Sequence, residues 1–330
     1  MPMDDPTTPP MHPIPSGTRD VLPDEMRELR AITGRMLDVF TARGYGEVAT
    51  PALEYESTLA VAGPGARPAY QLFDEAGEVL VLRSDMTVPI ARVAATRFGS
   101  AEPPLRFCYL AHAYRGVRPQ RGQSREFLQA GIELIGAPSP DGTAEALAVL
   151  CETLDAVGLE RYRVGVGDVS LYPALLDAVG VSPAARAPLL HELETRDFAG
   201  LEREIAGLGL GPADARSLLR VPQLRGGPGV LDEAAGLAGA SLDGMRAVVG
   251  LLDSQVANRV IVDLGLVRSL DYYTGAVFEV YDPALGVPLG GGGRYDDLLG
   301  RFGRPLPAAG FALAAERVHI ALAAEEAARE

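Results

Sequence analysis

The sequence predicts an α+β fold: a mixed, mostly antiparallel sheet flanked by helices and interrupted by an all-helical insertion. Strand-like runs follow one another without the strict strand–helix alternation that a parallel sheet requires. Strand character stops over residues 169–252, where Leu- and Ala-rich helical pieces are broken by Pro and Gly, and then returns. We therefore expect a core at 13–168 and 253–330, an insertion between them, and a disordered tail at 1–12.

The composition narrows the classes of function. The chain has 330 residues, of which 47% are hydrophobic, enough to bury a sizeable core. Its formal net charge is −14 and all its basic residues are arginine, which argues against broad nucleic-acid binding and excludes lysine chemistry. It has no apolar run of 18 residues and no signal-peptide pattern, so we expect a cytoplasmic protein with no membrane segment.

The candidate metal ligands are few and scattered. Cys108 and Cys151 lie in unlike contexts without CxxC spacing, and the four histidines form no recognisable ligand set. We expect buried reduced thiols, no metal and no cofactor.

The first half of the chain alternates helices and strand pairs. Apolar residues recur at helical spacing over 26–40, and Gly44 can end that helix. Two strand-like runs around a Gly-containing turn predict a hairpin over 69–85. The elements expected after it are a helix at 87–98, strands at 105–115 and 125–136 around a polar loop, and a helix at about 143–157.

After the insertion, strands are expected at 259–265 and 270–282, and the segment 310–330 reads as a strand that runs into a helix. In the second of these strands, Tyr272 and Tyr273 should face opposite sides, one toward the core and one toward a ligand. The four glycines from 290 lack the GK[ST] of a phosphate loop, and we interpret them as close backbone approach near a site.

The strand at 125–136 has a polar face. Residues alternate between the two sides of a strand, so Gln129 and Glu133 share one side, with Gly131 between them, while the other side is apolar. Together they would form a polar floor with room above it, and Arg115 nearby could clamp a carboxylate or a phosphate. Taken alone, such a face can equally be a solvated strand side, and Arg115 an ordinary surface arginine.

Ordered segments together resemble histidyl-tRNA synthetase, a class II aminoacyl-tRNA synthetase, over roughly residues 13–320. The matching segments are SGTRDVLP (16–23), LRSDMT (82–87), YRGVRPQRGQSREFLQAGIELIG (114–136), LVRSLDYYTGAVFE (266–279), and GGGRYDDLL with GFALAAERV (291–299 and 310–318).

The resemblance implies roles for the matching residues. Asp85, Thr87 and Gln129 would hold an amino group. Glu133, Tyr273 and Tyr295 would surround an imidazole, where carboxylate and phenol groups can fix the tautomer. The histidine-binding set that it implies is Asp85, Thr87, Arg115, Gln129, Glu133, Arg268, Tyr272, Tyr273 and Tyr295; within it, Arg115 would grip the α-phosphate side and Arg268 would be the histidine-specific arginine.

The sequence departs from that family at the nucleotide half of the site. Val117 stands where the family has a Glu that recognises adenine, Gln123 where it has an arginine, and Ala314 where it has a glycine. With Arg317, which would contact ATP phosphate, these residues are expected to form a vestigial nucleotide site. The sequence also ends about a dozen residues after Arg317, where the family continues into an anticodon-binding domain, so we expect no such domain and no tRNA binding.

The sequence keeps the residues expected to bind histidine and changes several of those expected to bind the nucleotide. In this combination it is similar to a paralogous family, the regulatory subunits of ATP phosphoribosyltransferase. That resemblance implies a non-catalytic subunit, required by a short catalytic subunit and for feedback control by L-histidine in the first step of histidine biosynthesis. It also implies a homodimer through the first motif, at Pro15–Leu22 and the following helix. Histidine could bind in the synthetase-like pocket or at a subunit interface.

Two other functions stay open. A truncated histidine-adenylating enzyme is compatible with the retained arginines, Arg115, Arg268 and Arg317. A nucleic-acid-binding regulator is less favoured, because the sequence contains no basic stripe.

Overall fold

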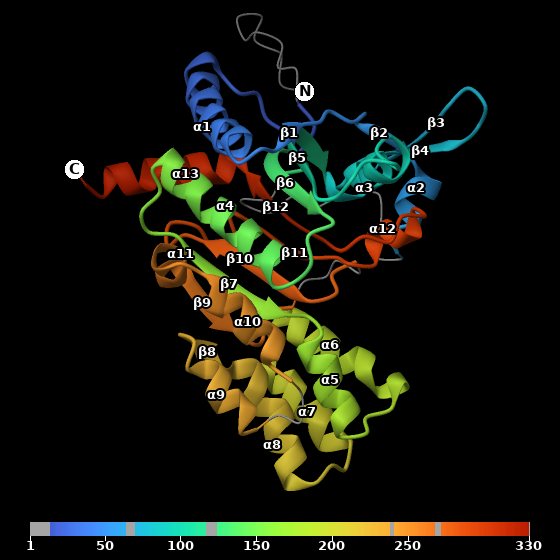
Figure 1. Ribbon diagram of the computed structural model, residues 1–330, viewed down its shortest axis with the longest axis vertical. Helices are drawn as coiled ribbons and strands as arrows, with labels where there is room; N and C mark the ends of the chain where they lie inside the picture. Colours follow the sequence, from blue (N-terminus) through green and yellow to red (C-terminus); the bar gives the residue numbers. More distant parts are fainter. Residues whose placement is uncertain (1–13, 64–69, 117–123, 238–240, 268–271, 330) are drawn as a thin grey trace, which may run out of the picture.

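The computed structural model describes residues 14–63, 70–116, 124–237, 241–267 and 272–329, so the expected tail at 1–12 lies outside the described residues. The predicted fold class is confirmed (Figure 1). A nine-stranded sheet runs in the order β1-β5-β6-β12-β11-β10-β7-β9-β8, with antiparallel neighbours except at the β1–β5 and β7–β9 pairs, which are parallel. A second, three-stranded antiparallel sheet has the order β2-β4-β3.

The strands of the large sheet are β1 (Gly46–Glu47), β5 (Leu105–Tyr114), β6 (Glu126–Ile135), β7 (Arg163–Asp168), β8 (Arg225–Gly226), β9 (Val260–Asp263), β10 (Ala276–Tyr281), β11 (Gly290–Arg294) and β12 (Ala308–Ala314). Those of the small sheet are β2 (Leu53–Tyr55), β3 (Gln71–Phe73) and β4 (Val79–Leu82). The expected hairpin is therefore β3 and β4, whereas β7 was not among the expected strands.

Three helices, α1 (Pro23–Ala42), α4 (Asp141–Val157) and α13 (Ala315–Ala327), cover one face of the large sheet (Figure 1). Their apolar residues form one core with the strands beneath, including Met36 and Phe40 from α1, Leu150 from α4, and Ile132 and Phe311 from the sheet. The apolar side chains of these helices are buried against the sheet, and this burial stabilises the packing of the helices on it.

A second core lies on the other face, at the β5–β6 end of the sheet. There α2 (Glu56–Ala60), α3 (Thr87–Thr96) and α12 (Leu298–Arg301) surround Tyr109, Tyr272 and Tyr295. Buried tyrosines need hydrogen-bond partners for their hydroxyl groups. The polar site described below lies next to this core and supplies such partners.

The segment after β7 forms a third core of its own, at the lower end of the molecule in Figure 1. Its helices are α5 (Leu171–Ala178), α6 (Arg186–Thr195), α7 (Phe198–Gly207), α8 (Pro212–Arg220), α9 (Val230–Ala235) and α10 (Asp243–Leu251), with short 3-10 turns at Pro183–Ala185 and Val221–Gln223. α11 (Ser254–Arg259) then leads into β9. We propose residues 169 and 252 as the boundaries of the helical insertion.

In one detail this segment differs from the expected all-helical insertion. Arg225 and Gly226 form β8, which adds to the edge of the large sheet by pairing with Val262 and Asp263 of β9. An edge strand offers unpaired backbone groups, and two residues are enough to pair with them. None of the helices in the described ranges combines the length and apolar character needed to cross a membrane.

The glycine run is a strand, β11, and its close backbone approach is confirmed. A Cβ at Gly290 would overlap the Ala312 carbonyl oxygen of β12, and one at Gly292 would overlap the Gly310 carbonyl oxygen. Side chains are therefore excluded here, and the strand leaves open space beside it.

Candidate functional site

A cavity of about 1030 Å³ opens along the large sheet, between the β5–β6 end and the first turn of α13. Most of the site residues that the sequence predicted line it: Asp85, Thr87, Arg115, Gln129, Tyr272, Tyr273, Tyr295, Ala314 and Arg317. Three others, Val117, Gln123 and Arg268, lie outside the described residues. The volume is at the upper end of the range for small-molecule sites.

Glu133 lies beneath this cavity and is fully buried. Its Oε1 accepts a 2.7 Å hydrogen bond from the Thr87 hydroxyl, and its Oε2 accepts one from the Tyr295 hydroxyl. Burial raises the pKa of Glu133 to about 8; the two hydrogen bonds oppose the shift, and the nearby Asp85 carboxylate adds to it. The site thus contains a carboxyl group that can be neutral or charged near neutral pH.

Asp85 and Gln129 supply two further acceptors. Asp85 precedes α3 and accepts a 3.1 Å hydrogen bond from the Val88 backbone N–H; burial raises its pKa, although Arg115 opposes the shift. The Oε1 atom of Gln129 is buried and has no hydrogen-bond partner among the residues that the structure describes. A buried acceptor without a partner is costly unless a ligand donates to it, so this end suits a ligand with N–H donors.

The strand prediction for β6 is confirmed, because Gln129 and Glu133 lie on the cavity side while Ala130, Ile132 and Leu134 lie in the core under α1 and α4. The prediction for the adjacent tyrosines is confirmed in part: Tyr272 is buried in the second core, but the two side chains do not face opposite sides. Tyr272 and Tyr273 precede β10, so strand alternation does not apply to them, and both line the cavity with their ring centroids 5.0 Å apart. The Tyr272 and Tyr295 rings also meet edge to face, with centroids 5.8 Å apart.

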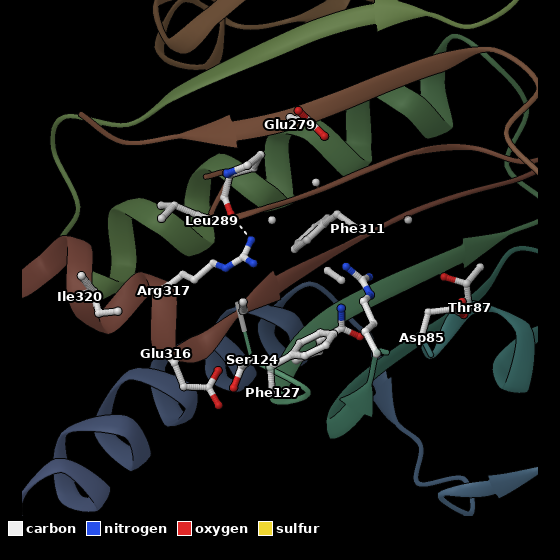
Figure 2. A pocket seen from close by; sticks show the side chains of 18 of the residues that line it. Asp85, Thr87, Ser124, Phe127, Glu279, Leu289, Phe311, Glu316, Arg317 and Ile320 are labelled. Atoms are coloured by element: carbon white, nitrogen blue, oxygen red, sulfur yellow. Dashed lines mark hydrogen bonds between the residues drawn. The ribbon is translucent and has the colours of Figure 1, made fainter. Parts of the chain in front are cut away.

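The other end of the cavity lies where β12 becomes α13. Figure 2 places Arg317 there, beside Leu289 and Glu316 and away from Asp85 and Thr87. Arg317 donates a 2.6 Å hydrogen bond to the Pro288 carbonyl oxygen. Burial, and then the positive charge of Arg115, lower the pKa of Arg317. Two guanidinium groups that face one cavity attract an anionic group.

Several lining residues were not predicted. Tyr109, Glu279 and Phe311 come from strands, where the alternation of residues could have indicated them once the cavity face was known. Leu193, Glu194 and Arg196 come from α6 and its C-terminal end. Arg196 reaches the site because it pairs with Asp263 of β9 at 3.2 Å, a contact across 67 residues of sequence that no local pattern encodes.

A mostly antiparallel sheet with an amino-acid-sized polar end and an arginine-bearing end in one cavity defines a class II aminoacyl-tRNA synthetase-like protein. The family model described as histidyl-tRNA synthetase matches residues 17–318. The regulatory subunit of ATP phosphoribosyltransferase from Desulforamulus reducens is 40% identical over 312 residues, 93% of this chain and 78% of that protein. The protein of the same name from Symbiobacterium thermophilum is 41% identical over 316 residues, 93% of this chain and 79% of that protein.

Solved structures agree. An ATP phosphoribosyltransferase regulatory subunit/histidyl-tRNA synthetase from Bacillus halodurans C superposes with a TM-score of 0.87 at 35% identity, covering 95% of this chain and 84% of that one. A histidine–tRNA ligase subunit from Alicyclobacillus acidocaldarius gives 0.80 at 32% identity, covering 97% and 99%. The chain belongs to the histidyl-tRNA synthetase family and, within it, to the regulatory subunits of ATP phosphoribosyltransferase.

Proposed function

We propose that this chain is a non-catalytic regulatory subunit of ATP phosphoribosyltransferase, which a short catalytic subunit requires for activity and for feedback control by L-histidine. The relatives that support this role carry that name and match more than nine tenths of the chain. The single observation that carries the proposal is that the residues expected to bind histidine are kept, whereas those expected to bind the nucleotide are changed. The acceptor end of the cavity is assembled around Glu133, whereas the predicted adenine contact is Val117.

The acceptor end suits histidine. An imidazole has one nitrogen that donates and one that accepts, and a carboxyl group beside a phenol can serve both. Glu133 and Tyr295 provide that pair. Asp85 and Gln129 Oε1, which no other described side chain or backbone group contacts by a hydrogen bond, are acceptors for an α-ammonium group. A hydrogen bond to a charged group contributes about 1.5–3 kcal/mol. We propose L-histidine as the ligand here, bound within the chain.

The other end is less suited to ATP. Ala314 lines it, and its methyl group adds bulk where the family has a glycine. In the sequence, Val117 and Gln123 stand where the resemblance expects an acceptor for an adenine amino group and an arginine. Each lost contact weakens binding by about 1–3 kcal/mol. We therefore propose that this end is a vestigial nucleotide site, and that the chain binds neither ATP productively nor tRNA.

We propose two protein partners in the cytoplasm, the short catalytic subunit and a second copy of this chain. Two exposed apolar surfaces support self-association. Ile14, Leu22 and Met26 lie at the start of α1, in the first-motif region. Leu53, Tyr55 and Leu72 lie on one side of the small sheet, where the pairing register places them together with Leu80 and Leu82. Contiguous exposed apolar surface is typical of a protein interface.

The test is reconstitution. A short catalytic subunit that is inactive alone should gain phosphoribosyltransferase activity when mixed with this chain, and L-histidine should inhibit the mixture. Gln129→Leu should leave the activation intact and weaken the inhibition, because it removes an acceptor without touching the outer surface. A mixture that stays inactive contradicts the regulatory role. Inhibition that Gln129→Leu does not change contradicts the histidine pocket alone.

A second candidate is a histidine-adenylating enzyme. Arg115 and Arg317 both line the cavity, and the solved structure from Alicyclobacillus acidocaldarius is named a histidine–tRNA ligase subunit. Histidine-dependent exchange between ATP and pyrophosphate by the purified chain would establish this activity. We expect none, while a full-length histidyl-tRNA synthetase serves as the positive control.

A further inference from the structure

The residue before Tyr295 is a buried arginine that faces away from the cavity. Arg294 ends β11 and its side chain is only 4% exposed. Its guanidinium donates to Asp296 Oδ2 at 2.9 Å, to the Ala137 carbonyl oxygen at 3.1 Å and to the Thr143 hydroxyl at 3.5 Å. These partners tie the end of β11 to the first turn of α4, on the face of the sheet opposite the cavity.

The backbone of Arg294, and Asp296, the partner of its side chain, are joined to the segment that carries the other cavity tyrosines. The Thr274 backbone N–H donates to the Arg294 carbonyl oxygen at 2.8 Å, and the Thr274 hydroxyl accepts from the Asp296 N–H at 2.9 Å. Asp296 Oδ1 in turn accepts from the Ala308 N–H at 3.2 Å. The residues on both sides of Tyr295 are therefore fixed to α4, to β12 and to the turn that follows Tyr273.

A buried arginine with polar partners is not the arrangement that stability alone favours. Burying an arginine is costly, and replacing a buried ion pair with apolar residues is often neutral or stabilising. A binding site has a different requirement, because its side chains must be held within about 0.5 Å of the productive geometry. The planar fork of arginine presents up to five N–H donors in a fixed geometry, whereas the ammonium group of lysine presents three donors on a flexible stem.

We propose that Arg294 is a positioning residue, which fixes the Tyr295 hydroxyl on Glu133 and the turn that carries Tyr272 and Tyr273, and so sets the affinity of the cavity for an imidazole ligand. The part on affinity rests on the proposed histidine site. The part on geometry does not, because the hydrogen bond between Tyr295 and Glu133 joins two residues of the chain itself.

The first measurement is L-histidine affinity by calorimetry for Arg294→Lys and for a matched control, Arg106→Lys. Arg106 makes a two-pronged contact with Glu145 of α4, both bonds 3.0 Å long, and does not line the cavity. Arg294→Lys should weaken binding at least tenfold, while Arg106→Lys should change it less than twofold at a similar loss of melting temperature. Equal affinities in the two variants would overturn the inference.

The second measurement needs no ligand. The infrared band of the protonated Glu133 carboxyl group is the one that Glu133→Gln removes, and its pH midpoint reports the pKa of Glu133. The Tyr295 hydrogen bond lowers that pKa, as does the one from Thr87, while burial and Asp85 raise it; Tyr109 and Tyr272 also face the group. If Arg294 positions Tyr295, Arg294→Lys should move the midpoint upward. An unmoved midpoint contradicts the inference.

The two measurements test the proposed histidine site and the positioning role of Arg294 separately. A wild-type chain that binds no histidine contradicts the proposed function, and the infrared midpoint then decides on Arg294. If Arg294→Lys does not fold, Asp296→Asn weakens the same contact from the other partner and should shift the midpoint in the same direction.

Discussion

The Thr87 hydroxyl donates a 2.7 Å hydrogen bond to Glu133, joining the first residue of α3 to the middle of the large sheet. Since Tyr295 donates to the other carboxyl oxygen, Glu133 is oriented from two sides by residues of the chain itself. A pre-oriented group loses little conformational entropy on binding. The pocket therefore presents one fixed carboxyl group whose charge depends on pH.

Glu133→Gln tests that charge. Glutamine resembles the protonated carboxyl group but cannot become an anion, so the loss of affinity should depend on pH. We expect L-histidine binding to weaken roughly 10- to 100-fold at pH 8.5, the range for one hydrogen bond to a charged group, and clearly less at pH 6.5. Calorimetry at the two pH values measures this. A loss of the same size at both would show that the ligand does not sense the charge of Glu133.

The same group predicts how the stability of the unliganded chain depends on pH. The pKa of Glu133 is about 8 in the folded state, above its ordinary value of 4.5. Between those values the folded state keeps a proton that the unfolded state has released, so the contribution of Glu133 to stability falls as the pH rises. Below pH 4.5 that contribution is complete, and above pH 8 it is lost.

Urea unfolding of the wild type and Glu133→Gln at several pH values from 5 to 9 measures this contribution. The free energy of unfolding of the wild type should decline relative to that of the variant as the pH rises. The raised pKa of Asp85 acts in the same direction in both proteins, so the difference between them reports Glu133 together with its coupling to Asp85. A difference that does not change with pH would contradict the buried, protonated state of Glu133.

The strand carrying Glu133 could be predicted from the sequence because its information is local. Alternation with a period of two fixes which side chains share a face, and the apolar set at Ala130, Ile132 and Leu134 leaves only one face for Gln129 and Glu133. The family resemblance then supplied the neighbours of that face. Neither source needs long-range contacts to be known in advance.

The errors arise where contacts are long-range or the backbone is irregular. Tyr272 and Tyr273 were treated as strand residues, but β10 begins only at Ala276, and a turn can direct adjacent side chains to one cavity. Arg196 was not predicted, because its place beside the cavity depends on a pairing with Asp263 that forms only after the helical segment folds onto the sheet.

Gly310 predicts a steric test of the same site. A Cβ there would overlap the Glu133 carboxylate and the Ile132 carbonyl oxygen, so Gly310→Ala must displace one of them. We expect a loss of about 1–3 kcal/mol in stability from overpacking, together with weaker histidine binding. Gly34→Ala is the control. Gly34 lies in α1, and within the part of the chain that the structure describes no neighbouring atom lies within 4 Å of the added methyl group, so the substitution should stabilise the chain by about 0.5–1 kcal/mol. Thermal unfolding and calorimetry compare the two. A fully tolerated Gly310→Ala would mean that the backbone around Glu133 is looser than these contacts imply.

Self-association can be assigned to a surface by charge substitutions. Leu22 at the start of α1 and Leu72 on the small sheet are 67% and 45% exposed, and each belongs to one of the two exposed apolar surfaces. A carboxylate at the centre of an apolar interface is strongly destabilising, so Leu22→Glu or Leu72→Glu should convert a dimer to a monomer. Light scattering after size-exclusion chromatography measures the mass.

Leu251→Glu is the matched control, since Leu251 is 50% exposed at the end of α10, and it should leave the dimer intact. If only Leu72→Glu dissociates the dimer, the self-interface is the small sheet and not the first-motif region. A wild-type chain that is monomeric at all concentrations would contradict both surfaces.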